Sequence, residues 1–248
     1  MAGHNKWSKV KHRKAVVDKR RSKVWSKVSR AIIVAARHGG ADPNFNLALR
    51  YAIDEARYAN MPRDVIERAV QKGAGGGDMS AYETVRYEGY APGGVAVIVD
   101  ALTDNRTRTA TDVRNAFGEH GGNLGATGCV AFLFAPRGRI GVRTPGVVED
   151  ALMEAALNAG ALDVLAPDDP ADAESEWTVL TDVPSYQGVR DALEKGGYTL
   201  GECELTMLPE QWVEVRGEQA ASVRAIVEQL EDLDDVQKVY TNAAMPDE

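Results

Sequence analysis

Positive charge is concentrated at the start of this 248-residue chain. Residues 1–30 hold eleven Lys and Arg residues against one acidic residue, Asp18, which gives a net charge of +10. The whole chain has 29 basic and 37 acidic residues, so residues 31–248 hold 18 basic against 36 acidic residues, or −18. A polyanion is attracted by the first part and repelled by the second. We therefore expect a nucleic acid to dock on the amino-terminal end, with strong salt dependence.

Length and composition indicate a globular protein of one to three domains, because 44% hydrophobic residues suffice for packed cores. No stretch approaches the roughly 20 apolar residues that cross a bilayer, and the start lacks the apolar region of a signal peptide. Cys129 and Cys203 have no CxxC spacing, which favours structural thiols in a reducing compartment. We expect a cytoplasmic protein; an organelle transit peptide is the alternative reading of the acid-poor start.

Helical periodicity covers the first 72 residues. Apolar side chains recur in one sector over residues 15–37, and a second stripe follows the helix-start signal Asp42-Pro43. A third short helix is predicted to end at Gly73, and the glycines at 75–77 indicate a linker and a domain boundary.

The first helix also carries a row of cations. On the helical wheel they lie roughly opposite the apolar sector, about 6 Å apart along the helix. Such spacing suits a phosphate backbone. The row consists of Lys19, Lys23, Lys27, Arg30 and Arg37.

Beyond the linker, alternating apolar residues indicate strands separated by helices. Predicted elements are strands 83–90 and 94–102, helix 107–120 and strand 128–134; then strand 138–143, helix 147–159, strands 162–165 and 176–182, helix 185–196 and strand 198–207; and finally strand 211–216, helix 218–232 and strand 235–241.

The predicted fold class is multidomain α+β: an N-terminal three-helix domain followed by two ferredoxin-like β-α-β-β-α-β domains, one inserted in the other. The predicted domains are residues 1–74, residues 79–135 with 210–243, and the inserted residues 136–209. We prefer the inserted arrangement because both α+β domains then have a complete sheet, and neither has an uncovered sheet edge. A sequential layout is the alternative.

Motifs for catalysis, metals and cofactors are absent from the sequence. His4, His12, His38 and His120 show no HExxH spacing, and there is no GxSxG, no GxxxxGK[ST] and no GxGxxG between a strand and a helix. We therefore expect no enzyme activity, no metal and no cofactor. A metabolic enzyme, with a deep pocket of shifted titratable groups, is the remaining competing class.

Three segments favour binding. Residues 1–15 interleave bases with Trp7 and two histidines, which suits phosphate pairing and base stacking; a disordered solubilising tail is the alternative. Residues 103–109 connect a strand to a helix, where Arg106 and Arg108 could hold an anion, or Thr and Asn could simply cap the helix. Residues 120–125 favour a sharp turn with positive φ over a functional loop.

Long segments of the chain resemble the YebC family. They are MAGHNKW, KHRKA, VAARHGG with DP, NMPRDVIERA, YEGYAPGGVAVIVDALTDNRTRT, HGGNLG and DDVQKVYTN, and they span the whole chain, although residues 138–205 match only in pattern. Ala91 departs from the glycine usual in that family.

This resemblance implies a helical domain, two α+β domains and no assigned catalysis. Members of the family, whose mitochondrial relatives include the translational activator of cytochrome c oxidase subunit I, are described in two ways. One description is DNA-binding transcriptional regulators. The other is ribosome-associated factors that help synthesis through difficult stretches such as consecutive prolines.

The predicted nucleic-acid-binding residues come from the resemblance and from charge. The family's basic motif matches His4, Lys6, Trp7, Lys11, His12, Arg13 and Lys14; charge adds Lys9, Lys19, Arg20, Lys23, Lys27, Arg30 and Arg37; and the helix start adds Arg106 and Arg108.

RNA is the favoured partner, because the cations are spread over a tail and a long helix, and are not gathered in a short recognition helix. We predict binding to ribosomal or transfer RNA on the ribosome, with DNA as the alternative. The sequence has no exposed heptad seam that would form a dimer interface, so we expect a monomer. We also expect no membrane partner.

Overall fold

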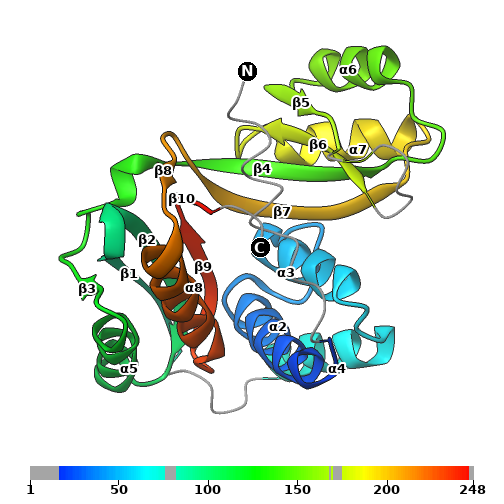
Figure 1. Cartoon of the computed structure of the whole chain (residues 1–248). Helices are drawn as coiled ribbons and strands as arrows, with labels where there is room; N and C mark the ends of the chain where they lie inside the picture. Colours follow the sequence, from blue (N-terminus) through cyan, green and yellow to red (C-terminus); the bar gives the residue numbers. More distant parts are fainter. Residues whose placement is uncertain (1–16, 76–81, 168, 170–174, 246–248) are drawn as a thin grey trace. The chain divides into compact units, whose positions relative to one another are not determined.

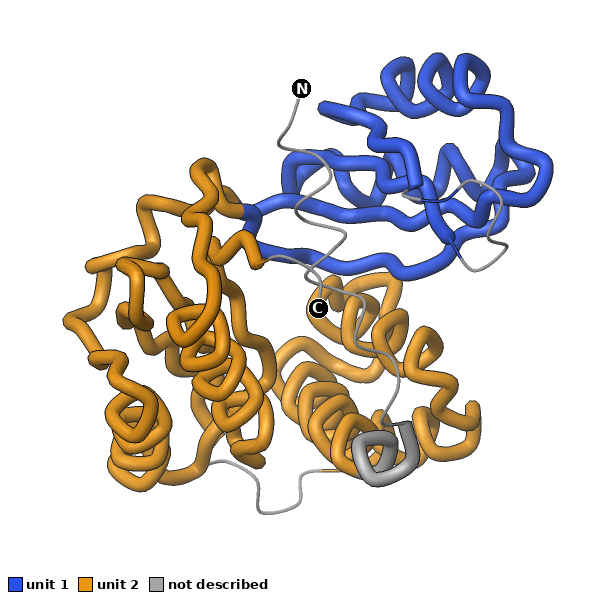
Figure 2. The backbone as a smooth tube through the Cα atoms, viewed as in Figure 1, with its two compact units in different colours: residues 1–8, 136–208 blue, residues 9–135, 209–248 orange. Residues whose placement is uncertain are grey.

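The computed structural model describes residues 17–75, 82–167, 169 and 175–245 (Figure 1), and for residues 17–22 it describes the backbone alone. Contacts divide these residues into two compact units (Figure 2): residues 136–208 form one, and residues before and after them form the other. Within the described ranges, no helix is both long and apolar enough to cross a lipid bilayer.

The predicted three helices are confirmed as α2 (Val17–Gly39), α3 (Leu47–Tyr58) and α4 (Arg63–Ala74). Ile32 of α2 and Leu49 of α3 are fully buried at the centre of their shared core. The second helix begins later than the predicted start at Asp42, because Asn46 is its cap: Asn46 Oδ1 accepts a hydrogen bond from Leu49 N at 3.1 Å.

The helix α4 ends at Ala74, one residue beyond the predicted end at Gly73. A Cβ atom at Gly73 would lie 2.4 Å from the carbonyl oxygen of Ile33 and 2.8 Å from Ala36 Cβ. The glycine therefore lets α4 cross the backbone of α2 closely, and it helps to fix the position of α2.

Substituting Gly73 with alanine is expected to lower the free energy of unfolding by about 1–3 kcal/mol, because the helices must separate. Gly118, on α5 (Arg106–Glu119), is a matched control, since no atom lies within 4 Å of the position that a Cβ would take there. Gly118→Ala should be neutral or stabilising by up to about 1 kcal/mol. Urea unfolding of both variants tests this; equal effects would contradict a close helix crossing at Gly73.

The larger unit contains a four-stranded antiparallel sheet in the order β3-β1-β2-β9. Its strands are β1 (Glu83–Ala91), β2 (Val95–Thr103), β3 (Asn123–Leu124) and β9 (Val236–Thr241). Phe117 of α5 and Ile226 of α8 (Gly217–Asp232) pack against inward side chains of β2 such as Val97. The two helices therefore cover the same face of this sheet.

Two predicted strands of this unit differ in the structure. In the predicted strand 128–134, residues 128–133 form a turn and a short 3-10 helix, η2 (Ala131–Leu133), and only Phe134 is in a strand. The Glu88 carboxylate accepts N–H groups that a strand would use. The strand predicted at 211–216 shortens to β8 (Val213–Glu214), which pairs with β10 (Ala243–Ala244) outside the main sheet. In the main sheet β1, which forms a hairpin with β2, takes a central position that the prediction had not given it.

The other unit is a β-α-β-β-α-β arrangement with strand order β5-β6-β4-β7. It consists of β4 (Phe134–Arg143), α6 (Glu149–Asn158), β5 (Asp163–Leu165), β6 (Glu176–Thr181), α7 (Tyr186–Lys195) and β7 (Leu200–Pro209). Strand β9 joins the first sheet only after this second sheet is complete (Figure 1). The predicted multidomain α+β class is confirmed, and the sequential alternative is not observed.

Candidate nucleic-acid interface

The predicted binding residues divide into those that the structure describes and those that it does not. Outside the described side chains lie His4, Lys6, Trp7, Lys9, Lys11, His12, Arg13, Lys14, Lys19 and Arg20. The described ones are Lys23, Lys27, Arg30 and Arg37 on α2, and Arg106 and Arg108 at the start of α5.

Three cations of α2 contact an acidic segment, residues 231–235, at the end of α8. Lys23 Nζ lies 3.2 Å from Asp232 Oδ1 and also donates to the Asp232 carbonyl group. Lys27 Nζ donates to the carbonyl oxygen of Glu231 at 2.6 Å. Arg30 Nη1 reaches the Asp234 carbonyl oxygen at 3.1 Å and Asp235 Oδ1 at 3.3 Å. The acidic segment and the carbonyl end of α8 thus face the cations of α2.

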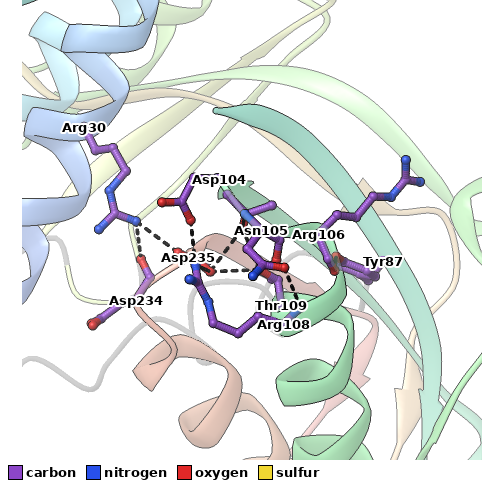
Figure 3. Close-up of polar contacts among 10 residues, drawn as sticks. Arg30, Tyr87, Asp104, Asn105, Arg106, Arg108, Thr109, Asp234 and Asp235 are labelled. Carbon is purple, nitrogen blue, oxygen red and sulfur yellow. Dashed lines mark hydrogen bonds and ion pairs between the residues drawn. The ribbon is translucent and has the colours of Figure 1, made fainter. Parts of the chain in front are cut away.

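Asp235 is the centre of this network (Figure 3). Its Oδ2 atom accepts hydrogen bonds from Arg108 Nη2 at 2.7 Å, Thr109 Oγ1 at 2.8 Å and Thr103 Oγ1 at 3.2 Å. Burial alone would raise the pKa of the Asp235 carboxyl, but the hydrogen bonds from Arg108 and Thr109 outweigh it and lower the pKa. Asp235 is therefore held in its charged form between α2 and α5.

The start of α5 has both features that were predicted as alternatives, a helix cap and a bound anionic group. Asn105 Oδ1 accepts the Arg108 N–H at 3.1 Å, as the capping alternative predicted. The anion beside this helix start is the chain's own Asp235, and Arg108 also pairs with Asp104 at 2.8 Å. Arg106 is exposed and points away from this cluster (Figure 3).

The positive charges of Lys23, Lys27, Arg30 and Arg108 are therefore compensated within the chain, which counts against a ready-made cationic face on α2. Burial, with help from nearby Lys23, lowers the pKa of Lys27 to about 8, against the opposing pull of Glu231, Asp234 and Asp232. Exposed ion pairs typically contribute about 0–1 kcal/mol each. Lys23 and Asp232 keep 34% and 74% of their side chains exposed, so this contact is one that a polyanion can compete for.

A buried carboxylate that sequence reasoning missed organises the turn before β4. Glu88 is only 2% exposed and accepts the N–H groups of Gly128, Val130 and Ala131, each at 2.8 Å. Burial alone would raise the pKa of Glu88, but the hydrogen bonds from these three donors outweigh burial and lower the pKa. In the strand alternation Glu88 falls on the same side as the exposed Arg86 and Tyr90, so the sequence held no signal for its burial.

The predicted sharp turn at residues 120–125 agrees with the backbone of Gly121, which has a φ of 77°.

Family comparison decides which proteins this chain is related to. The family described as TACO1/YebC protein N-terminal domain matches residues 5–76, and the one described as TACO1/YebC second and third domain matches residues 82–243. The chain belongs to the TACO1/YebC family.

Relatives of this TACO1/YebC protein match it from end to end. Proteins of Burkholderia thailandensis and Burkholderia lata, each named a probable transcriptional regulatory protein, are 50% identical over 248 residues and are covered completely. The crystal structure of a conserved hypothetical protein from Aquifex aeolicus is 46% identical, covers 98% of both chains and has a TM-score of 0.82.

Metal ligands and cysteine thiols are the two remaining kinds of site to consider in the described part of this TACO1/YebC protein. Among the described residues, no group of three or more His, Cys, Asp or Glu could hold a metal ion. Cys129 and Cys203 are both half-buried. Burial, together with the charge of Glu88, raises the pKa of Cys129, which is the opposite of what activates a nucleophilic cysteine.

Proposed function

We propose that this protein is a non-catalytic, nucleic-acid-binding regulator of gene expression. Charge separation carries the proposal: residues 1–75 hold 17 basic and 6 acidic residues, or +11, and residues 76–248 hold 12 basic and 31 acidic residues, or −19. A polyanion is attracted by the first part alone. Because Lys23, Lys27 and Arg30 of α2 contact the acidic segment, we propose that residues 4–20 make the first contact with the nucleic acid.

RNA is the nucleic acid we favour, with ribosomal or transfer RNA on the ribosome as the target. Cations spread along a segment and a helix suit backbone contacts, whereas DNA sequence readout uses a few side chains poised for base edges. Bound in this way, the protein would assist translation through difficult stretches by positioning, without making or breaking bonds.

Crosslinking of the intact protein in cells, followed by sequencing of the attached nucleic acid, tests this function. We expect ribosomal or transfer RNA fragments, and co-sedimentation with ribosomes that is lost as salt rises. Recovery of no nucleic acid at all would remove the proposal.

A DNA-binding transcriptional regulator is the second candidate, and the printed names of the Burkholderia relatives favour it. Footprinting on genomic DNA separates the two. Protection of preferred sites would support the second candidate, and uniform, salt-sensitive retention would eliminate it.

The acidic segment offers a test of whether α2 takes part. Changing Glu231→Gln, Asp232→Asn and Asp234→Asn should raise affinity for RNA about tenfold and steepen the salt dependence. The reason is that these carboxylates no longer attract Lys23 and Lys27 in competition with phosphates, although the backbone carbonyl contacts stay. A matched loss of three negative charges on α6, Glu149→Gln, Asp150→Asn and Glu154→Gln, serves as the control. Equal affinities of the two variants would exclude a role for the α2 cations.

A further inference from the structure

Phe45, in the turn between α2 and α3, is 89% exposed, whereas Phe117 and Phe134 are 0% and 5% exposed. Leu47, two residues further on, is 54% exposed. An exposed phenylalanine adds little to folding stability, since the hydrophobic gain requires removal from water. Large exposed apolar patches mark contact sites on protein surfaces, and Phe45 and Leu47 are the large apolar side chains exposed in and directly after this turn.

The backbone that presents Phe45 is held by side chains on both sides. Asn46 is 6% exposed, and its Nδ2 donates to the carbonyl groups of Ala35 and Gly40, both at 2.8 Å. Arg50 Nε donates to a third backbone carbonyl in the turn at 3.0 Å. The turn is therefore preorganised, so that a partner need not bear the entropic cost of ordering it.

The electrostatic surroundings of Phe45 select the kind of partner. Residues 17–75 hold 12 basic against 6 acidic residues, and Asp42 is the one acid between 37 and 50. Arg37 and His38 end α2 beside this turn. The other exposed aromatic residues, Phe132 at 69% and Tyr90 at 38%, belong to the acidic remainder of the chain. Only Phe45, among the described exposed aromatics, thus combines a π-face with a net positive domain.

We propose that Phe45 is a stacking platform for an unpaired base of single-stranded RNA, with Leu47 beside it as apolar support and the nearby cations attracting the phosphates. This inference rests on the proposed nucleic-acid-binding function. Stacking on an aromatic side chain is tolerant of sequence, and it requires a base whose face is not covered by a neighbouring base pair.

Binding of the full chain to a fluorescent oligouridylate, and to an RNA duplex of equal length, tests the inference. Phe45→Ala is expected to weaken single-strand binding about tenfold and to leave duplex binding within about twofold. Phe45→Tyr should restore binding because it keeps the ring, and Phe45→Leu should not. Phe132→Ala is the control and should bind like the wild type.

The outcomes separate this inference from the proposed function. If the wild-type protein binds neither RNA, the proposed function fails. If it binds RNA but Phe45→Ala binds equally well, or loses duplex and single strand alike, the stacking platform is excluded and the proposed function stands. Full binding of the single strand by Phe45→Leu would also exclude stacking, because leucine has no ring and offers only an apolar contact. Thermal unfolding should be unchanged in all variants, since Phe45 is exposed.

Discussion

Neutralising the cations of the amino-terminal segment is expected to lower the affinity for single-stranded RNA about 10³-fold in 0.1 M salt. The variant changes Lys6, Lys9, Lys11, Arg13 and Lys14 to glutamine. Each phosphate contact on a single strand contributes about 0.7 to the slope of log K against log salt, so losing five contacts should flatten that slope by about 3–4. Titrations at several salt concentrations measure both quantities.

A control variant with the same net charge separates local contacts from a general field. It changes five exposed cations, Arg63, Arg68, Lys72, Arg114 and Arg216, to glutamine. The ion-pair partners Glu67 of Arg63, Asp64 of Arg68 and Glu214 of Arg216 are exposed as well, so little stability is lost. The control should lose less than about tenfold in affinity. Wild-type affinity in the first variant would instead remove the main support for the proposed function.

The row of cations on α2 illustrates what helical periodicity can predict. The pattern placed Lys23, Lys27 and Arg30 away from the three-helix core, because burial of an apolar stripe depends on residues three and four apart. It could not predict what faces them, since their partners in the acidic segment are more than 200 residues away in sequence. A polar helix face looks the same whether it meets solvent or the chain's own carboxylates.

The segment 128–134 shows the same limit for strands. Its continuous apolar run from Cys129 to Phe134 fits a strand. However, Glu88, which lies 40 and 42 residues before Gly128 and Val130, accepts hydrogen bonds from their N–H groups. By contrast, the inserted unit was predicted element by element, because each of its helices and strands follows from local apolar spacing. Long-range hydrogen bonds to a single buried carboxylate are invisible to such spacing.

Substitution of Asp235, at the centre of the network, is the second change for which we expect a large effect, in this case on stability. Asp235→Asn is expected to lower the free energy of unfolding by about 2–3 kcal/mol, because Arg30 and Arg108 lose a charged acceptor that is only 13% exposed. Asp104→Asn is the matched control: it also pairs with Arg108, but Asp104 is 42% exposed, and it should cost less than about 1 kcal/mol.

The pH dependence of the Asp235→Asn effect identifies its cause. Since the folded-state pKa of the Asp235 carboxyl is lowered, its contribution is complete above the ordinary aspartate range and is lost as the pH falls through the folded-state pKa. Urea unfolding should show a constant difference between wild type and variant from pH 7 to pH 5, which then shrinks below about pH 4. If the difference in unfolding free energy stayed the same in acid, the loss in Asp235→Asn would come from altered packing. The charge of Asp235 would then not stabilise its contacts with Arg30 and Arg108.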